Sequence, residues 1–360
     1  MLRIIIGVSI LICLTFIFSL ACSSASEVVV EEKIVEIQKE VIKEAEGATS
    51  PGKLIIYSGR KESLVGPIIE QFEQASGIQV KVKYGSTGEM AATLMEEGES
   101  SPADVFFAQD PGGLGAIANE GMFIPLSSDV LGLVPTWAQS AEGLWVGISG
   151  RARTIVYNID ALDPSQMPST LQGFTDPQWK GKIGWAPTNG SFQAMVTAMR
   201  VIWGQEQTEF WLRAIQDNEP IIYSKNTPQV AAVAEGEILV GLVNHYYLHR
   251  FLSEEGDAFG ARNHHLEGGG PGSLVIVSGG GILSTAKNQE NAEKFFKFML
   301  STVAQQYFAG QTYEYPLVEG VQTDRLLTPL EEINKPDIDM VQLADLAGTQ
   351  AMLRDLGIIE

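Results

Sequence analysis

The sequence predicts two α/β lobes with a ligand-binding cleft between them, and three observations lead to this fold class. Apolar, strand-like segments alternate with segments whose apolar residues recur at helical spacing, which is typical of α/β folds. This alternation runs through residues 54–121 and starts again near residue 154, which indicates two units. A chain of 360 residues is long enough for two domains of about 100–200 residues, each with its own core.

The first unit is predicted to run in strand–helix order. Residues 54–57 form a continuous apolar run, as expected for a buried parallel strand. Period-two alternation predicts a strand over residues 78–84, and a further apolar run predicts one over residues 104–107. The apolar spacing predicts helices over residues 65–72, 90–95 and 114–118, each between or after these strands. This order implies a parallel sheet with right-handed crossovers.

The second unit begins with a predicted strand at residues 154–157. It continues with strands at residues 183–185 and 240–243 and a long helix over residues 192–203. A glycine-rich break at residues 268–272 precedes one more strand, at 274–277. Because ligands of open α/β sheets bind at the carboxyl ends of strands, residues that directly follow strands are candidates for the cleft.

Composition excludes several classes of protein. Lys and Arg number 24 against 44 Asp and Glu, for a formal net charge of −20. We therefore expect no nucleic-acid partner, because nucleic-acid binders need basic patches. The only two cysteines, Cys13 and Cys22, lie in the first 22 residues, so neither a disulfide framework nor a thiolate metal site is expected.

The N-terminus is predicted to be an export signal. Arg3 precedes an uncharged apolar run, residues 4–20, which ends in small residues and Cys22. The segment resembles a bacterial lipoprotein signal, which implies a signal peptide over residues 1–21 and a lipid anchor at Cys22. An uncleaved anchor helix is the alternative, since about 17 apolar residues can just span a bilayer. Residues 22–51, rich in Glu, Lys, Val and Ile, are predicted to be an acidic, helical tether, and the rest of the chain is expected outside the cytoplasm.

Enzyme motifs mostly fail, so we predict binding and no catalysis. The glycines at residues 279–281 follow a strand but match neither phosphate-loop pattern, and the chain has no G-x-S-x-G elbow. His245 and His249 have the i, i+4 spacing of a zinc-binding helix. However, Tyr246 stands where a zinc protease has its general base, Glu.

The tyrosine pair Tyr246-Tyr247 is the most informative motif. It follows the predicted strand at residues 240–243, where the cleft should lie. Adjacent residues diverge by about 100° on a helix and about 180° on a strand, so both reach one point only from a terminus or a bend. Phenolate is a hard oxygen ligand that suits a hard cation such as ferric iron. Two aromatic side chains packed at a lobe edge are the alternative interpretation of the pair.

From about residue 54 onward the chain resembles the bacterial ferric-ion-binding proteins, the receptors of ATP-binding-cassette iron importers. The motifs that carry the resemblance are residues 103–107, 151–158, 244–247, 308–318 and 345–357. It implies an α/β, two-lobed, type II periplasmic-binding-protein-like fold, with central mixed sheets flanked by helices and a ligand cleft between the lobes. Residues 52–150 and 275–330 would form lobe 1, residues 151–274 lobe 2, and residues 331–360 C-terminal helices that pack on the lobes.

The resemblance also implies an iron site. Tyr246 and Tyr247 match the paired iron-binding tyrosines of the family, with Glu62 or Gln109 as further ligands. The third tyrosine of some members would fall near Phe192, which cannot ligate a metal. A synergistic anion (carbonate, phosphate or citrate) and water would complete the coordination of Fe3+.

The anion site follows from the same resemblance. The family's anion loop matches Asn189, Gly190 and Ser191, which open a predicted helix, and helix N-termini bind anions. Asn226 and Asn244 match two polar residues that help hold the anion. Arg60 and Arg153 are the candidates to neutralise an anionic iron chelate such as citrate.

The function that the resemblance implies is capture of ferric iron and its delivery to an ABC transporter permease and its ATPase. Hinge closure would bring the first lobe over iron held by the second. We expect a lipid-anchored, extracytoplasmic monomer. The alternative is a receptor of the same fold for an organic solute such as a phosphonate, a polyamine or a small acid.

Overall fold

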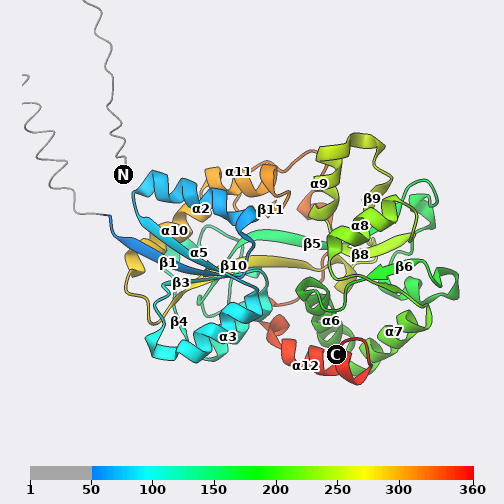
Figure 1. The fold of residues 1–360 in the computed structure, drawn as a ribbon, viewed down its shortest axis with the longest axis horizontal. Helices are drawn as coiled ribbons and strands as arrows, with labels where there is room; N and C mark the ends of the chain where they lie inside the picture. Colours follow the sequence, from blue (N-terminus) through cyan, green and yellow to red (C-terminus); the bar gives the residue numbers. More distant parts are fainter. Residues whose placement is uncertain (1–50) are drawn as a thin grey trace, which may run out of the picture. The chain divides into compact units, whose positions relative to one another are not determined.

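Two lobes that share long strands make up the part of the chain that the structure, a computed structural model, describes, residues 51–360 (Figure 1). The predicted signal peptide, the lipidation site Cys22 and the predicted tether up to residue 50 lie outside the described residues. In the described part, no helix is long and apolar enough to cross a membrane.

The first lobe contains the strand–helix repeat that the sequence predicts. Its strands are β1 (Lys53–Ser58), β2 (Gln79–Tyr84), β3 (Val105–Ala108) and β4 (Phe123–Ile124). Its helices are α2 (Glu62–Ser76), α3 (Thr87–Glu97), α4 (Pro111–Asn119), α5 (Ser128–Leu131), α10 (Gln289–Met299) and α11 (Thr302–Gln311). Strands β2, β1 and β3 are parallel neighbours, which confirms the predicted parallel arrangement.

The second lobe is built around a smaller set of strands. They are β6 (Ile183–Trp185), β7 (Ile221–Ile222), β8 (Val240–Asn244) and β9 (Ala261–His264). The helices are α6 (Gly190–Trp203), α7 (Gln205–Asp217), α8 (Asn226–Ala234) and α9 (Tyr246–Glu255). Strands β6 and β8 are parallel, and both carboxyl ends are followed by predicted site residues.

Strand β5 (Val146–Asn158) joins the two lobes (Figure 1). It pairs with β10 (Val275–Leu283) and β11 (Tyr315–Pro316) in the first lobe and with β8 and β9 in the second, all antiparallel. The strand predicted at residues 154–157 is therefore the second half of a longer one. The predicted lobe boundary at residues 150–151 falls inside β5, and the sheets are mixed, as predicted.

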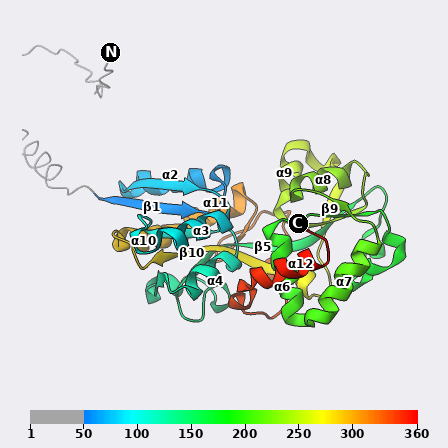
Figure 2. The same cartoon turned by 60° about the horizontal axis from the view of Figure 1, so that its bottom comes forward.

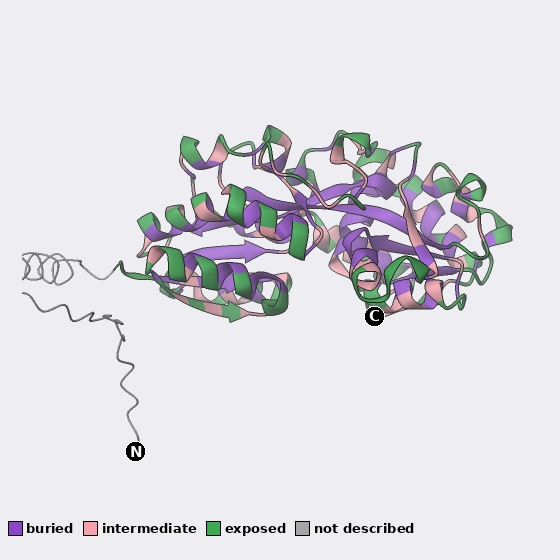
Figure 3. Cartoon of the chain, turned by 90° about the horizontal axis from the view of Figure 1, so that it is seen from above, coloured by how far each residue is buried: buried purple, intermediate pink, exposed green. Residues whose placement is uncertain are grey.

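Burial follows this layered arrangement. The strands lie inside each lobe and the helices present exposed outer faces (Figure 3). All 13 residues of β5 and all nine of β10 are buried, which explains why their sequences carry no period-two alternation. The glycines of β10 permit close packing, because a Cβ added at Gly279 would lie 2.3 Å from the carbonyl oxygen of Val146 on β5.

The C-terminal segment packs on both lobes. It contains short 3-10 turns at Leu330–Glu332 and Met340–Ala344 and one α-helix, α12 (Leu346–Asp355). The turn Met340–Ala344 packs on α4 of the first lobe, and α12 packs on α6 of the second (Figure 2). Buried Thr349 of α12 hydrogen-bonds Thr197 of α6, with 2.7 Å between the hydroxyl oxygens.

Candidate metal centre

The tyrosine pair lies where a strand of the second lobe turns into a helix. Strand β8 ends at Asn244, and Tyr246 and Tyr247 are the first two residues of α9. Their rings stack with centroids 4.3 Å apart at 29°, so the helix start lets two consecutive side chains lie together, as the sequence required. Arg250, one turn later, places its guanidinium carbon 5.5 Å and 5.7 Å from the two ring centroids.

Burial disfavours ionisation of Tyr247 when no cation is bound. Tyr246 is 2% exposed and Tyr247 is half-buried. The pKa of Tyr247 is raised well above its ordinary value, first by burial and then by the charge and the hydrogen bond of Tyr246. The charges of Arg151 and Arg250 act in the opposite direction. A strongly charged cation bound between the phenol oxygens would supply the attraction that two phenolates need here.

His245 anchors the pair and is not available as a ligand. Its Nε2 donates to the carbonyl oxygen of Tyr313 at 2.7 Å, and its Nδ1 accepts from the backbone N–H of Ala152 at 3.1 Å. Its ring stacks on that of Tyr315, with centroids 4.6 Å apart. Burial, with the charges of other histidines, holds the pKa of His245 well below its ordinary value, so the ring is neutral. These contacts fix the residue that directly precedes Tyr246.

Three of the predicted anion-binding residues, Ser191, Asn244 and Arg153, form one chain of hydrogen bonds. Ser191 Oγ accepts from Asn244 Nδ2 at 3.0 Å, and Asn244 Oδ1 accepts from Arg153 Nη1 at 3.0 Å. Arg153 and Asn244 face each other in the β5–β8 register, which explains the second bond. Gly190 begins α6 beside Asp110 of the first lobe: an added Cβ would lie 3.6 Å from Asp110 Oδ2. The two lobes therefore meet at this loop.

Asn189 occupies the helix end that was predicted to bind an anion through free N–H groups. Its side chain accepts from the N–H of Ser191 at 3.0 Å, and its carbonyl accepts from those of Phe192 and Gln193. These three N–H groups already have partners. Polar side chains near the loop are thus the better candidates to hold an anion.

Asn226 is one such side chain. It is fully buried at the start of α8, and its Nδ2 has no hydrogen-bond partner among the described residues. An unpartnered buried amide costs about 1–3 kcal/mol, which a bound anion would recover.

Three buried arginines lie within electrostatic range of the tyrosines. Arg60, Arg151 and Arg153 are each at most 1% exposed, and each has two guanidinium nitrogens without a hydrogen-bond partner in the described part of the chain. The pKa of Arg153 is lowered to about 9, because burial outweighs the attraction of Tyr247 and Tyr246. The sequence prediction included Arg60 and Arg153 but missed Arg151.

Arg151 and Asp110 add charges that the sequence prediction lacked. Arg151 donates to the backbone carbonyl of Gln109, at the end of β3. The pKa of Asp110 is raised, because burial outweighs the attraction of Arg151 and two backbone hydrogen bonds. Arg151 and Arg153 are two apart on one strand and so share a face, a signal visible in the sequence.

The two predicted further ligands, Glu62 and Gln109, differ in burial and in their neighbours. Glu62 is exposed at the start of α2, and its charge acts on Tyr84. Gln109 is half-buried and lies beside Arg151 through its backbone carbonyl. No hydrogen bond among the described residues joins either side chain to the tyrosines. In residues 51–360, no group of three or more His, Cys, Asp and Glu is placed to hold a metal ion.

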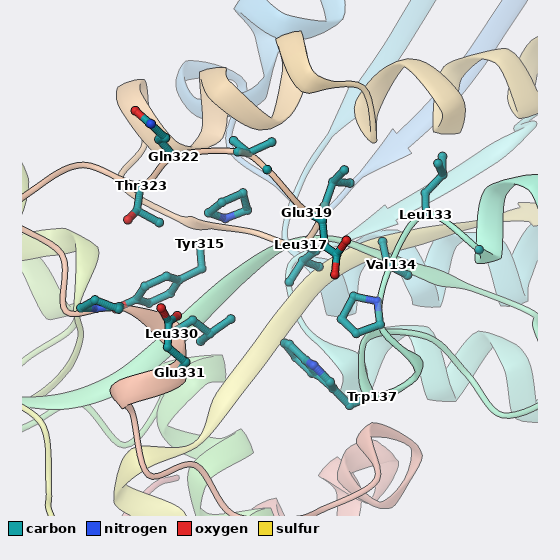
Figure 4. A pocket seen from close by; sticks show the side chains of 17 residues that line it. Leu133, Val134, Trp137, Tyr315, Leu317, Glu319, Gln322, Thr323, Leu330 and Glu331 are labelled. Atoms are coloured by element: carbon teal, nitrogen blue, oxygen red, sulfur yellow. The ribbon is translucent and has the colours of Figure 1, made fainter.

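A separate groove of about 960 Å³ lies among residues 132–137, 315–323 and 329–331 (Figure 4). Trp137, Leu317 and Leu330 line it, and Tyr315 forms one wall. Its lining contains none of the predicted site residues. Tyr315, which lines the groove, also stacks on His245.

Comparison with known proteins identifies the family. Residues 57–306 match the family model of bacterial extracellular solute-binding proteins. The chain belongs to this family. Its membership confirms the predicted solute-binding class and agrees with the expected extracytoplasmic location.

Similar proteins narrow the class further. This solute-binding protein is 30% identical to the Fe(3+)-binding periplasmic protein of Serratia marcescens, over 83% of this chain and 89% of that one. It is 34% identical to iron-bound HitA from Pseudomonas aeruginosa, with a TM-score of 0.81 over 85% of this chain and all of that one. For the Trichodesmium protein IdiA (FutA) in complex with iron and citrate, the identity is 29% and the TM-score 0.76, over 85% and 99% of the two chains. The type II binding-protein fold and the resemblance to ferric-ion-binding proteins are both confirmed.

Proposed function

We propose that this solute-binding protein captures ferric iron together with an anion and delivers it to an ABC importer. The observation that carries the proposal is the stacked pair Tyr246–Tyr247 among three buried arginines, at the junction of the two lobes. The names and contents of the similar proteins support iron as the cargo.

Tyr246 and Tyr247 are the proposed protein ligands. Their phenolates are hard donors, and ferric iron is acidic enough to displace the phenol protons. Of the two further candidates, Gln109 is the better placed, because its backbone contacts Arg151. Glu62, exposed beside Tyr84, would have to move to reach the tyrosines.

An anion is needed for charge balance. Without an anion, three guanidinium groups would face a trivalent cation held by only two phenolates. The fully buried carboxylate of Glu314 offsets only one of these guanidinium groups, that of Arg60, with which it is paired. A multiply charged anion such as carbonate, phosphate or citrate would bind the free nitrogens of Arg60 and Arg153 and the free amide of Asn226. The side chains of Ser191, in the loop Asn189–Ser191, and of Asn244 would hold its other side.

The arginines weigh against part of the alternative function. A polyamine carries only positive charge, so three buried arginines would repel it. An anionic organic solute, such as a phosphonate or a small acid, fits the same donors without using the tyrosines. The test must therefore separate ferric chelates from anions alone.

Delivery and anchoring complete the proposal. A permease would bind both lobes and reopen them, and its ATPase would drive the cycle. Acylation at Cys22 would hold the protein, as a monomer, on the outer surface of the membrane, with residues 22–51 as the tether.

The visible spectrum tests the iron site directly. Wild-type protein with ferric citrate should show a ferric-phenolate charge-transfer band. Tyr246→Phe and Tyr247→Phe should each weaken it, and the double variant should lose it. Tyr223→Phe is the matched control, because Tyr223 is in the same lobe but its hydroxyl bonds Glu237.

A wild-type protein that stays colourless with ferric citrate would refute iron capture. Calorimetry would then decide the alternative, with citrate, an aminoalkyl-phosphonate and spermidine as probes. Binding heat with an iron-free anion that is unchanged in the Tyr246→Phe and Tyr247→Phe variants would identify an organic-solute receptor.

A further inference from the structure

Glu314 is a fully buried carboxylate in the wall of the candidate site. It lies between α11 and β11 and is 0% exposed. One of its oxygens accepts from Arg60 Nη2, and the other accepts from Ser149 Oγ on β5. Both oxygens are thus used, so Glu314 is not free to coordinate a metal itself.

Its partner Arg60 is held by one edge only. Arg60 follows β1, is 0% exposed, and has Nε and Nη1 without hydrogen-bond partners among the described residues. A buried guanidinium normally uses more of its donors, so these two are placed for a ligand. Arg60 also lies within electrostatic range of Tyr246 and Tyr247.

The neighbours of Glu314 hold the other side of the site. The carbonyl of Tyr313 accepts from His245 Nε2 at 2.7 Å, and the ring of Tyr315 stacks on the His245 ring. Tyr313 has a positive φ of 56°, which costs a non-glycine residue about 1 kcal/mol or more and persists only where the surroundings enforce it. Alternate residues of this segment therefore face His245 of the second lobe, while Glu314 between them faces Arg60 of the first.

We propose that Glu314 is a positioning residue: it orients Arg60 toward the ligand and offsets part of its charge, and so sets how much negative charge the site prefers in a bound ferric chelate. The proposal rests on the proposed function. A buried carboxylate close to an anion site repels anions, and a buried ion pair gains little stability over apolar residues. A contribution to stability therefore does not explain why this carboxylate is present. Orienting Arg60 and offsetting part of its charge would explain it.

The sign of the effect follows from charge alone. Without the carboxylate, Arg60 presents a full positive charge in a poorly solvated site, and the preference for a more anionic chelate should rise. Without the guanidinium, Glu314 is left as an uncompensated negative charge, and that preference should fall. Removing both charges should return it toward the wild-type value.

Citrate and malate are suitable probes for this preference. Both are hydroxycarboxylates that hold ferric iron through the same group, and citrate carries one more carboxylate. Each chelate, with chelator in excess, is titrated into the protein at constant pH and ionic strength. The charge-transfer band gives an apparent dissociation constant for each, and the readout is the ratio of the two constants. General damage to the fold weakens both and leaves the ratio unchanged.

We expect Glu314→Gln to raise the preference for citrate about tenfold and Arg60→Gln to lower it about tenfold, as for one charge about 12 Å away at an effective dielectric constant of about 20. The double variant should lie within about threefold of wild type. Glu319→Gln and Arg325→Gln are the controls, since they make the same charge changes at exposed positions. Both should stay within about twofold of wild type, because solvent screens exposed charges.

The outcomes separate this proposal from the one on which it rests. A wild-type protein with no band overturns iron binding and with it the role of Glu314. A wild-type band with a ratio that stays within twofold in every variant overturns the role of Glu314 alone. If Glu314→Gln does not fold, Arg60→Gln and the double variant decide: equal citrate preferences in these two overturn the proposal, and a higher one in the double variant supports it.

Discussion

Replacing Arg153 by Met should make the ligand-free protein more stable while weakening its binding of the ferric chelate. Arg153 is 1% exposed on β5, and its guanidinium makes one side-chain hydrogen bond, to Asn244. Its charge is kept in the protein interior without a carboxylate partner among the described residues. Met has a similar length and volume and carries no charge, so it should fill the space without a large cavity.

The magnitude follows from the lowered pKa. Burial lowers the pKa of Arg153 from 12.5 to about 9, and each unit corresponds to 1.36 kcal/mol, so the charged form is penalised by about 5 kcal/mol. The substitution also leaves Asn244 Oδ1 without its donor, which costs about 2 kcal/mol. The net gain is about 3 kcal/mol, or about 6 °C in Tm at about 2 °C per kcal/mol for a protein of this size.

Thermal unfolding of iron-free protein in an anion-poor buffer at pH 7 is the assay, followed by titration with ferric citrate. We expect the higher Tm together with at least about tenfold weaker binding, since a hydrogen bond to a charged group is worth about 1.5–3 kcal/mol. Arg213→Met is the control: Arg213 is exposed in an i, i+4 pair with Glu209, so its loss should change stability by less than about 0.5 kcal/mol. If Arg153→Met melts several degrees below wild type, the buried charge of Arg153 does not destabilise the ligand-free protein, contrary to our prediction.

Two further predictions concern the fold. Gly279→Ala should destabilise the protein by more than about 2 kcal/mol, because the new Cβ would lie 2.3 Å from the Val146 carbonyl oxygen. Gly310→Ala is the control: its Cβ would lie in open space on α11, so the change should be neutral or stabilising. Urea unfolding measures the stability of both variants. Burial, with the charges of two other histidines, lowers the pKa of His265 to about 4, so the unfolded chain binds more protons between pH 4 and 6.5 and stability falls as the pH drops through this range. His265→Asn should remove up to about 3 kcal/mol of that pH dependence, measured as unfolding free energies at pH 4.5 and 7, and an unchanged slope would contradict the assignment.

Local sequence patterns predict the elements that carry the site, because strand ends and helix starts are set by nearby residues. The apolar run before Asn244 and the tyrosines after it predict a strand that ends at the candidate site, and β8 and α9 confirm that order. Likewise Asn189 before an amphipathic segment predicts a helix start, and it caps α6.

The contacts that assemble the site are long-range and leave no local signal. Glu314 pairs with Arg60 from 254 positions away, and His245 is held by Tyr313 and Tyr315 from a different lobe. Closeness in the sequence also does not guarantee closeness in the site. Glu62 lies only two residues after Arg60, but α2 begins at Glu62 and leaves it exposed beside Tyr84.

A crystal structure of the protein with ferric citrate, with anomalous diffraction recorded at the iron absorption edge, would show directly whether Tyr246 and Tyr247 bind ferric iron. We expect one anomalous peak within bonding distance of the phenol oxygens of both Tyr246 and Tyr247, with an anion between the metal and the arginines. An anomalous peak elsewhere, or an organic anion at the arginines with no iron beside the tyrosines, would contradict it.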